Sequence, residues 1–248
     1  MSKFHDISVV AKYSLFLRKL GFSDNCTPDE LDITGLSIPE NLLLAFFQNR
    51  MGELSDEEIV SFYELFGAMN CIRVTKMSVK IAQFMMLAGV IPENTRSIVE
   101  FGGGPGVLAN FIRKEIGCKI SVLDACMSYL HYCQMLSLQL QIEVPTIHSL
   151  GDETPLESSA YDLAFAIDMI DCSSRWEQII REMARVARNV AVIYTPYSRF
   201  RYLDPRKVRD EFGANGLVIT HDEVFNPSHL VGGDDTESIW FMITGARR

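Results

Sequence analysis

The chain has 248 residues, of which 48% are hydrophobic and 22% charged, as in a globular protein of one large or two modest domains. Its net charge of −9 argues against general binding to nucleic acid or anionic membranes, because both need excess Lys and Arg. No apolar run reaches about 18 residues, the length of a membrane span. The sequence shows no secretory signal, no C-x-x-C pair and no zinc-like Cys/His spacing. We therefore expect a cytoplasmic protein that binds no metal and whose six cysteines are reduced thiols.

The first third of the chain, residues 1–94, has helical patterning throughout. Apolar periodicity predicts a helix over 5–20, and Pro39 is placed to begin a second. Ser55 and the acids after it fit a capping box at the start of a third helix. A last apolar stripe predicts a fourth helix over 71–88. We expect these helices to form a lid that shapes a substrate pocket.

From residue 95 the pattern changes to strands that alternate with helices, which is typical of a parallel sheet covered on both faces. No helical pattern separates the last two strands, only a loop over 222–236, so these two are expected to pair like a hairpin. The predicted strands are 97–101, 119–123, 144–148, 162–167, 190–194, 217–220 and 238–244, and the predicted helices between them are 107–116, 128–140, 175–186 and 205–212.

A glycine-rich turn follows the first of these strands, with four glycines in the five positions 102–106. Glycine allows a sharp turn and a close approach of a ligand to the backbone. The next helix points its free N–H groups into the turn. A phosphate-binding P-loop is excluded because Val107, and not lysine, follows Gly106, and a dinucleotide fingerprint lacks its third glycine at the same position.

The spacing acid-x-G-x-G-x-G is met in full by residues 100–106. This is the first motif of the class I S-adenosylmethionine-dependent methyltransferases, and the chain resembles that family over about residues 95–248. The resemblance implies an α/β, Rossmann-like sheet of seven strands whose last strand is antiparallel, with S-adenosylmethionine as cofactor. It divides the chain into a helical lid, 1–94, and a cofactor-binding domain, 95–248. The motif residues implied to hold the cofactor are Glu100, Gly102, Gly104 and Gly106.

Acidic residues follow the next three strands, where ligands of open α/β sheets bind. Asp124 ends the second strand and is expected to accept hydrogen bonds from both ribose hydroxyls. By resemblance, Asp152 after the third strand lies near the adenine amino group. Asp168 after the fourth strand could pair with the α-ammonium group of the cofactor. A solvated loop acid remains the alternative for Asp152.

The resemblance implies methyl transfer, for which the protein must hold the acceptor beside the methyl carbon. If the acceptor is a hydroxyl or ammonium group, a base must also remove a proton, and the candidates are His221, His229 and Asp171. The two histidines could equally be ordinary loop or core residues, and Asp171 could cap the following helix. An apolar lid favours a small-molecule acceptor, and the motif Asn/Asp-Pro-Pro-Tyr/Phe of DNA and protein-glutamine methylation is absent at 168–171.

Three alternatives stay open. Enzymes similar to nicotianamine synthase, or related cyclases, use the same fold and cofactor but transfer or close the aminobutyryl group and release methylthioadenosine. A non-enzymatic subunit could keep the fold to bind a partner. Five cations within 199–209 could hold an anionic group of the acceptor, form a solvated helix start, or contribute to a homodimer contact.

Overall fold

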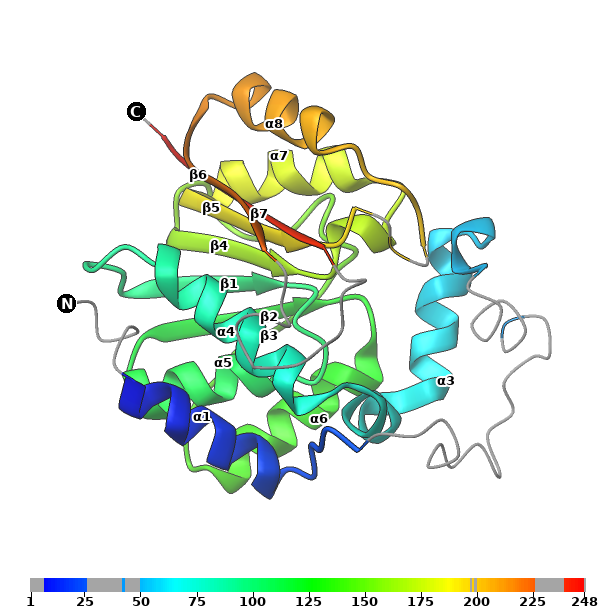
Figure 1. Ribbon diagram of the computed structural model, residues 1–248, viewed down its shortest axis with the longest axis vertical. Helices are drawn as coiled ribbons and strands as arrows, with labels where there is room; N and C mark the ends of the chain where they lie inside the picture. Colours follow the sequence, from blue (N-terminus) through cyan, green and yellow to red (C-terminus); the bar gives the residue numbers. More distant parts are fainter. Residues whose placement is uncertain are drawn as a thin grey trace.

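The alternating apolar strands of the second part of the chain form one seven-stranded sheet in the order β3-β2-β1-β4-β5-β7-β6 (Figure 1). The computed structural model describes residues 7–25, 42, 50–196, 198, 200–225 and 239–247. Neighbouring strands from β3 to β5 are parallel, whereas β7 is antiparallel to both β5 and β6. The fold class predicted from the sequence is therefore confirmed. The strands are β1 (Ser97–Phe101), β2 (Lys119–Asp124), β3 (Thr146–His148), β4 (Tyr161–Ile167), β5 (Ala187–Tyr194), β6 (Leu217–Phe225) and β7 (Trp240–Arg247).

Helices cover both faces of this sheet. On one face, α7 (Trp176–Val186) and α8 (Pro205–Ala214) pack on β4, β5, β6 and β7. On the other lie α4 (Met77–Val90), α5 (Val107–Phe111) and α6 (Met127–Gln139), with α1 (Ile7–Lys19) packed on α4 and α5. Figure 1 shows α3 (Asp56–Val74) standing apart from these layers, beside the end of the sheet. The helix α3 thus lies over the carboxyl ends of the strands.

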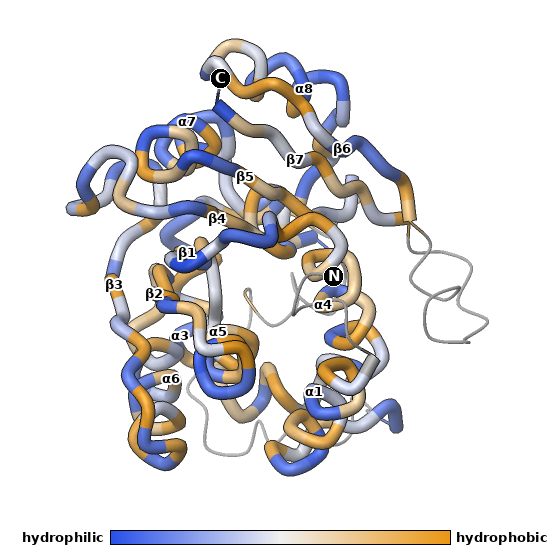
Figure 2. The backbone as a smooth tube through the Cα atoms, turned by 90° about the vertical axis from the view of Figure 1, so that its left-hand side faces the viewer, coloured by the Kyte–Doolittle hydropathy of each residue, from blue (hydrophilic) through white to orange (hydrophobic). Residues whose placement is uncertain are grey.

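Successive side chains of the central strands point to opposite faces of the sheet, so each strand contributes to two cores. Ile98 of β1 joins the core under α1, α4 and α5, whereas its neighbour Val99 joins the core under α7 and α8. Figure 2 shows hydrophobic stretches along the central strands and on the helices around them. A third, smaller core joins α3 to Phe200, and so ties the helical region to the loop after β5.

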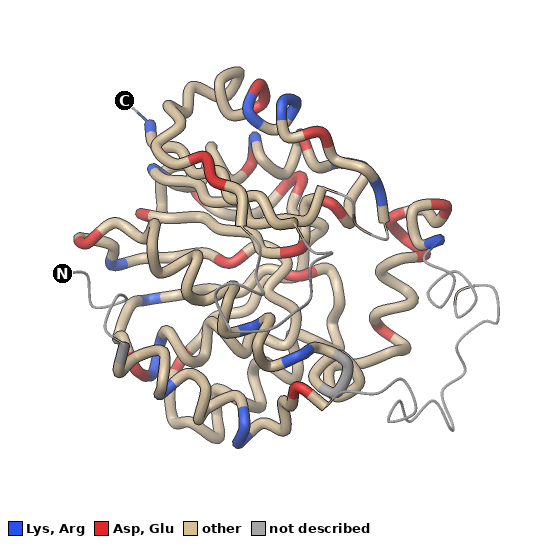
Figure 3. The backbone as a smooth tube through the Cα atoms, viewed as in Figure 1, with Lys and Arg blue, Asp and Glu red and all other residues tan. Residues whose placement is uncertain are grey.

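Charged positions are interspersed over helices and strands in Figure 3, consistent with an ordinary solvated surface. The capping box predicted at the start of α3 is present: Ser55 Oγ accepts from the Glu58 backbone at 3.2 Å, and the Glu58 carboxylate accepts from the Ser55 backbone at 2.8 Å. Among the described residues, no helix has both the length and the apolar character that crossing a membrane requires.

The prediction of one helix over 71–88 is wrong, because the apolar stripe hides a break. The helix α3 ends at Val74, and α4 begins at Met77. Between them Thr75 is extended, and its hydroxyl donates to the carbonyl oxygen of Cys71 at 2.8 Å, which satisfies one of the free carbonyls at the helix end. No glycine or proline marks this position. Of the helix expected to begin at Pro39, only Leu42 is among the described residues, and it is helical.

The prediction that the sixth strand ends at Thr220 and gives way to a loop from residue 222 is also wrong. The strand β6 continues to Phe225 and pairs with β7 along its length, with a register shift between Ile219 and His221. It is the edge strand of the sheet, and its second half carries polar side chains exposed to solvent. Without a buried face, the alternation that reveals a strand is absent from the sequence.

Candidate functional site

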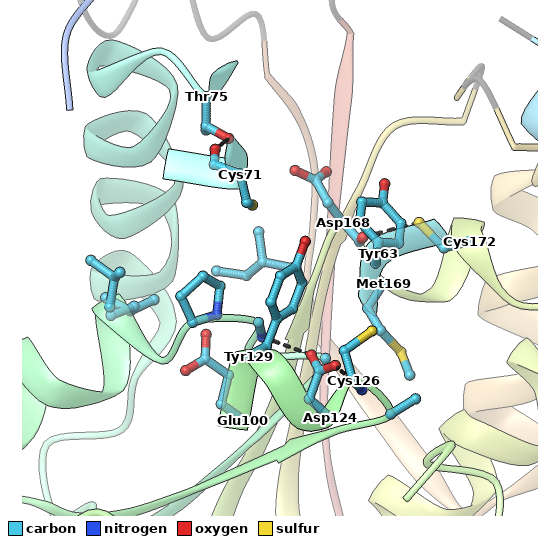
Figure 4. Close-up of a pocket in the computed structure, with 18 of the residues that line it drawn as sticks. Tyr63, Cys71, Thr75, Glu100, Asp124, Cys126, Tyr129, Asp168, Met169 and Cys172 are labelled. Atoms are coloured by element: carbon cyan, nitrogen blue, oxygen red, sulfur yellow. Dashed lines mark hydrogen bonds between the residues drawn. The ribbon is translucent and has the colours of Figure 1, made fainter. Parts of the chain in front are cut away.

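A cavity of about 1110 Å³ lies at the carboxyl ends of β1, β2 and β4 and is closed on its other side by α3 and α4. This is the place where open α/β sheets bind ligands. Residues of the strand ends line one wall, and residues of the two helices line the other (Figure 4). Among the residues predicted from the sequence, the cavity is lined by Glu100, Gly102, Gly104, Asp124, Asp168 and Asp171.

The glycine turn after β1 adopts a conformation that favours glycine. Gly102, Gly104 and Gly106 have φ values of 65°, 54° and 65°, in the left-handed region. Gly106 does not line the cavity: a Cβ atom there would lie 2.2 Å from Sγ of Cys133, so its bare backbone lets α6 pack closely. At Gly102 a Cβ atom would lie 2.2 Å from Cγ of Met169, which occupies the space beside the turn.

Glu100 is buried beneath this turn, on the face of β1 that carries α4 and α5. Its side chain is 6% exposed, and its Oε2 atom has no hydrogen-bond partner among the described residues. Burial raises the pKa of Glu100 to about 8, while the positive charge of Lys80 acts to lower it and the negative charge of Asp124 to raise it further. The carboxyl is therefore largely protonated at neutral pH in the absence of a ligand.

Asp124 joins the glycine turn to the start of α6. Its Oδ2 atom accepts from the backbone of Gly104 at 2.7 Å, and Oδ1 accepts from the backbone of Cys126 at 2.8 Å. Burial raises the pKa of the Asp124 carboxyl, and the two N–H donors oppose that shift. The carboxylate thus fixes the turn relative to the second strand while it lines the cavity.

Asp168 has an unusual backbone conformation directly after β4, with φ of 51° at a residue other than glycine. Such strain persists only where surrounding contacts hold the residue, and it gathers at functional sites. One such contact is from Gln83 of α4, whose side-chain amide donates to Oδ2 of Asp168 at 2.6 Å. Gln83 is only 2% exposed within an otherwise apolar helix face.

Asp171 lies three residues further, in the short helix η4 (Ile170–Cys172), and is 3% exposed. Burial raises the pKa of Asp171 to about 7, and the nearby charge of Asp168 contributes to the same shift, whereas a hydrogen bond from Ser198 opposes it. Its Oδ1 atom has no hydrogen-bond partner within the described part of the chain. A carboxyl with a pKa near neutrality and an open acceptor atom is suited to proton transfer.

Besides Gly106, two predicted site residues within the described part of the chain do not line the cavity. Asp152, expected near adenine, lies outside the lining, and its carboxylate accepts from Arg175 at 2.8 Å. His221 lies within β6 rather than at its end, with Nδ1 at 3.1 Å from Oγ1 of Thr244, beside a separate cavity of about 580 Å³. The structure therefore does not support His221 as a base at the main cavity. His229 lies outside the described residues.

Several lining residues were missed by reasoning from the sequence. Lys80, Gln83 and Tyr129 come from helices whose apolar stripes look like ordinary packing. A buried glutamine within such a stripe is the one available signal, because buried polar groups need a partner. Met169 follows Asp168 directly and carries no signal of its own. Tyr63 and Phe66 of α3 also line the cavity, although aromatic residues at helical spacing usually pack in a core.

Carboxylates fasten α3 to the two loops that carry Asp124 and Asp168. At its start, Asp56 accepts from the Ser173 hydroxyl at 2.9 Å and from the Ser174 backbone at 2.9 Å. In its middle, Glu64 accepts from the Ser128 backbone at 3.0 Å and from that of Met127, at the amino end of α6. An acid at that helix end is favoured by the helix dipole. These bonds thus hold the helical wall of the cavity against the wall formed by the strand ends.

The residues around the cavity fit a nucleoside with an attached amino acid. Asp124 supplies carboxylate oxygens at the second strand end, where ribose hydroxyls would donate. Near the glycine turn, Glu100 has an unpartnered Oε2 atom that could accept from an α-ammonium group, and the nearby Lys80 carries the positive charge that an α-carboxylate would need. The sheet order and this cavity define a Rossmann-like fold of the methyltransferase type.

One known family matches part of the chain: residues 98–189 match the family described as methyltransferase domain. The matched stretch includes the glycine turn, Asp124 and Asp168, and is similar to an S-adenosylmethionine-dependent methyltransferase domain, whose cofactor is S-adenosylmethionine. No curated protein matches the sequence.

Solved structures with the same fold share little sequence with this chain. The [4+2]-cyclase SpnF has a TM-score of 0.58 at 12% identity, with 71% of this chain and 83% of that one covered. Magnesium protoporphyrin IX methyltransferase (ChlM) from Synechocystis PCC 6803 with bound SAM has a TM-score of 0.54 at 14% identity, covering 69% and 78%. YcgJ from Bacillus subtilis has a TM-score of 0.55 at 12% identity, covering 68% and 99%. These identities show the fold alone.

Proposed function

We propose that this protein methylates an oxygen or nitrogen atom of a small molecule. The observation that carries the proposal is the size and position of the cavity, which at about 1110 Å³ exceeds the roughly 300–1,000 Å³ typical of a site for one ligand. The cavity extends from the strand ends to α3 and α4, so it offers room for an acceptor beside the cofactor. Enclosure by helices favours a small molecule over a macromolecule.

In this proposal the residues divide the work by their position. Asp124 binds the ribose, Glu100 and Asp168 surround the α-ammonium group, and the backbone of Gly102 and Gly104 faces the methionine part. Lys80, partly buried and close enough to Glu100 to affect its pKa, binds the α-carboxylate. The bound cofactor supplies an activated methyl group on a sulfonium. The protein orients the acceptor, excludes water, and accepts a proton at Asp171.

Product analysis tests the proposal. We expect the protein, incubated with S-adenosylmethionine and a pool of small-molecule acceptors, to release S-adenosylhomocysteine, detected by mass spectrometry. Release of methylthioadenosine alone would contradict methyl transfer and favour transfer or cyclisation of the aminobutyryl group. The cyclase among the similar structures makes this control necessary, because the fold is not restricted to methyltransferases. Absence of cofactor binding in calorimetry would favour a non-enzymatic subunit.

A further inference from the structure

We infer that the acceptor is an amine carried on a flat ring, and that its nitrogen is bound and deprotonated by Asp171. The inference rests on the proposed function and adds the chemical class of the acceptor. Three observations carry it: an unpartnered carboxylate oxygen, the distribution of charge along the cavity, and an aromatic wall.

The unpartnered oxygen is Oδ1 of Asp171. The side chain lines the cavity and is 3% exposed, yet this atom has no hydrogen-bond partner among the described residues. A buried acceptor without a donor costs free energy, so the site is complete only when a ligand supplies an N–H or O–H group. A carboxylate in the acceptor has no such proton to donate at neutral pH.

The charges around Asp171 restrict the chemical class of the acceptor further. Three carboxylates, Asp56, Asp168 and Asp171, line this part of the cavity. A guanidinium nitrogen of Arg201 lies 3.7 Å from Oδ1 of Asp56, while its Nε atom has no hydrogen-bond partner among the described residues, and its positive charge also acts on Asp171. Two lysines, Lys76 and Lys80, also line the cavity, and Lys80 affects the pKa of Glu100 nearer the glycine turn. Because Asp168 is assigned to the α-ammonium group of the cofactor, an anionic acceptor would meet the charge of Asp171, whereas an ammonium group would offset it.

Aromatic side chains form the wall contributed by α3 and its neighbours. Tyr63 lies between two other rings that line the cavity, with ring centroids 6.1 Å from Tyr129 and 6.3 Å from Phe200. In Figure 4, Tyr129 and Asp168 point into the same space. Such a wall stacks on flat rings and attracts cations through the faces of its own rings.

The reaction follows from this placement. The ammonium group of the acceptor gives one proton to Oδ1 of Asp171, which frees the nitrogen lone pair. That lone pair forms the new bond to the methyl carbon, and the electron pair of the broken carbon–sulfur bond stays on sulfur, which leaves as the neutral thioether. The methylated nitrogen keeps its remaining protons and a positive charge, so charge and atoms balance.

Binding experiments with two matched series of probes test the inference without turnover. One series is tryptamine, tryptophol and indoleacetate, and the other is phenethylamine, phenethyl alcohol and phenylacetate. Each is titrated into the protein saturated with S-adenosylhomocysteine. We expect the amines to bind about tenfold or more tightly than the matched alcohols and acids, as for a charge-assisted hydrogen bond. Equal or tighter binding of an acid, or no binding by either amine, would overturn the inference.

The variant Asp171→Asn tests whether Asp171 is the residue that causes the preference for amines. It keeps the shape of the side chain but removes its charge, and we expect the amine preference to fall about tenfold. Affinity for S-adenosylhomocysteine should stay within about twofold, and this readout also shows that the variant is folded. The matched control is Asp222→Asn, a surface carboxylate of β6 paired with Arg209, which should keep the preference.

An unchanged preference in Asp171→Asn would refute the role of Asp171. The outcomes also separate the two proposals. Amine-selective binding together with methylthioadenosine as product would leave the acceptor class standing and remove methyl transfer. If S-adenosylhomocysteine formed only with the alcohols, methyl transfer would stand and the amine as acceptor class would be refuted.

Discussion

Acidic side chains at the strand ends have the same charge but different surroundings. Asp124 is held by two backbone donors and Asp168 by the buried amide of Gln83, whereas Oδ1 of Asp171 is buried without a hydrogen-bond partner among the described residues. Asp152, which follows the third strand, is instead paired with Arg175 outside the cavity. Of the three acids predicted to bind the cofactor after the second, third and fourth strands, Asp124 and Asp168 line the cavity and Asp152 does not. Most of these partners come from residues far away in the sequence, so the spacing of residues within a motif does not predict them.

The ribose role of Asp124 predicts a clear effect of substitution. Asp124→Ala should weaken binding of S-adenosylhomocysteine about tenfold or more, because it removes a charged acceptor from a buried site. The matched control is Asp152→Ala, for which we expect a change below about twofold because that side chain does not line the cavity. Calorimetric titration measures both. Asp124→Asn, which keeps one carbonyl oxygen as acceptor, separates loss of the ligand contact from loss of the turn.

Glu100 should make the stability of the cofactor-free protein depend on pH. Its pKa is about 8 in the folded protein and about 4.3 in an unfolded chain, so the folded state holds a proton that the unfolded state has lost between these values. Stability from this group is complete below the unfolded pKa and is lost as pH rises toward the folded pKa.

Compared with Glu100→Gln, which resembles the protonated acid at all pH values, the wild type should lose up to about 1.4 kcal/mol of unfolding free energy per pH unit between pH 5 and 8. Urea unfolding at several pH values measures the difference. If the unfolding free energies of the two proteins changed with pH in the same way, burial would not keep Glu100 protonated.

Among the elements, α3 contains a feature that its apolar stripe does not reveal. Gly67 has φ of 75° and ψ of 162° inside the helix, so the helix is kinked there, and residues on both sides of the kink line the cavity. Residues other than glycine adopt this conformation only with strain. Ile59, Phe62 and Phe66 of α3 are buried, but a glycine inside an apolar stripe does not by itself predict a kink.

Two glycine-to-alanine changes should have opposite signs. At neither position would a new Cβ atom meet another atom within 4 Å, so the backbone alone decides. Gly67→Ala should lower the free energy of unfolding by about 1–3 kcal/mol because of its positive φ. Gly89→Ala, in the regular helix α4, should raise it by about 0.5–1 kcal/mol. Urea unfolding compares them, and a stabilised Gly67→Ala protein would exclude strain at the kink.

For the whole molecule, the sheet was predictable because buried parallel strands leave continuous apolar runs between helical patterns. The edge strand β6 was predicted too short because it buries little. The helical region was recognised as helical, but its contacts with the sheet were not predictable, since Asp56 and Glu64 look like ordinary acids of a solvated helix. The division at residues 94 and 95 stays a prediction.

The fastening of α3 has a consequence for how the site forms during folding. The bonds that shape the cavity join residues far apart in the sequence: 118 positions from Asp56 to Ser174, 85 from Gln83 to Asp168, and 64 from Glu64 to Ser128. Closing such long loops costs entropy that is recovered only when the contacts are made. The cavity is therefore complete only after the amino-terminal helices have docked on loops that are synthesised much later.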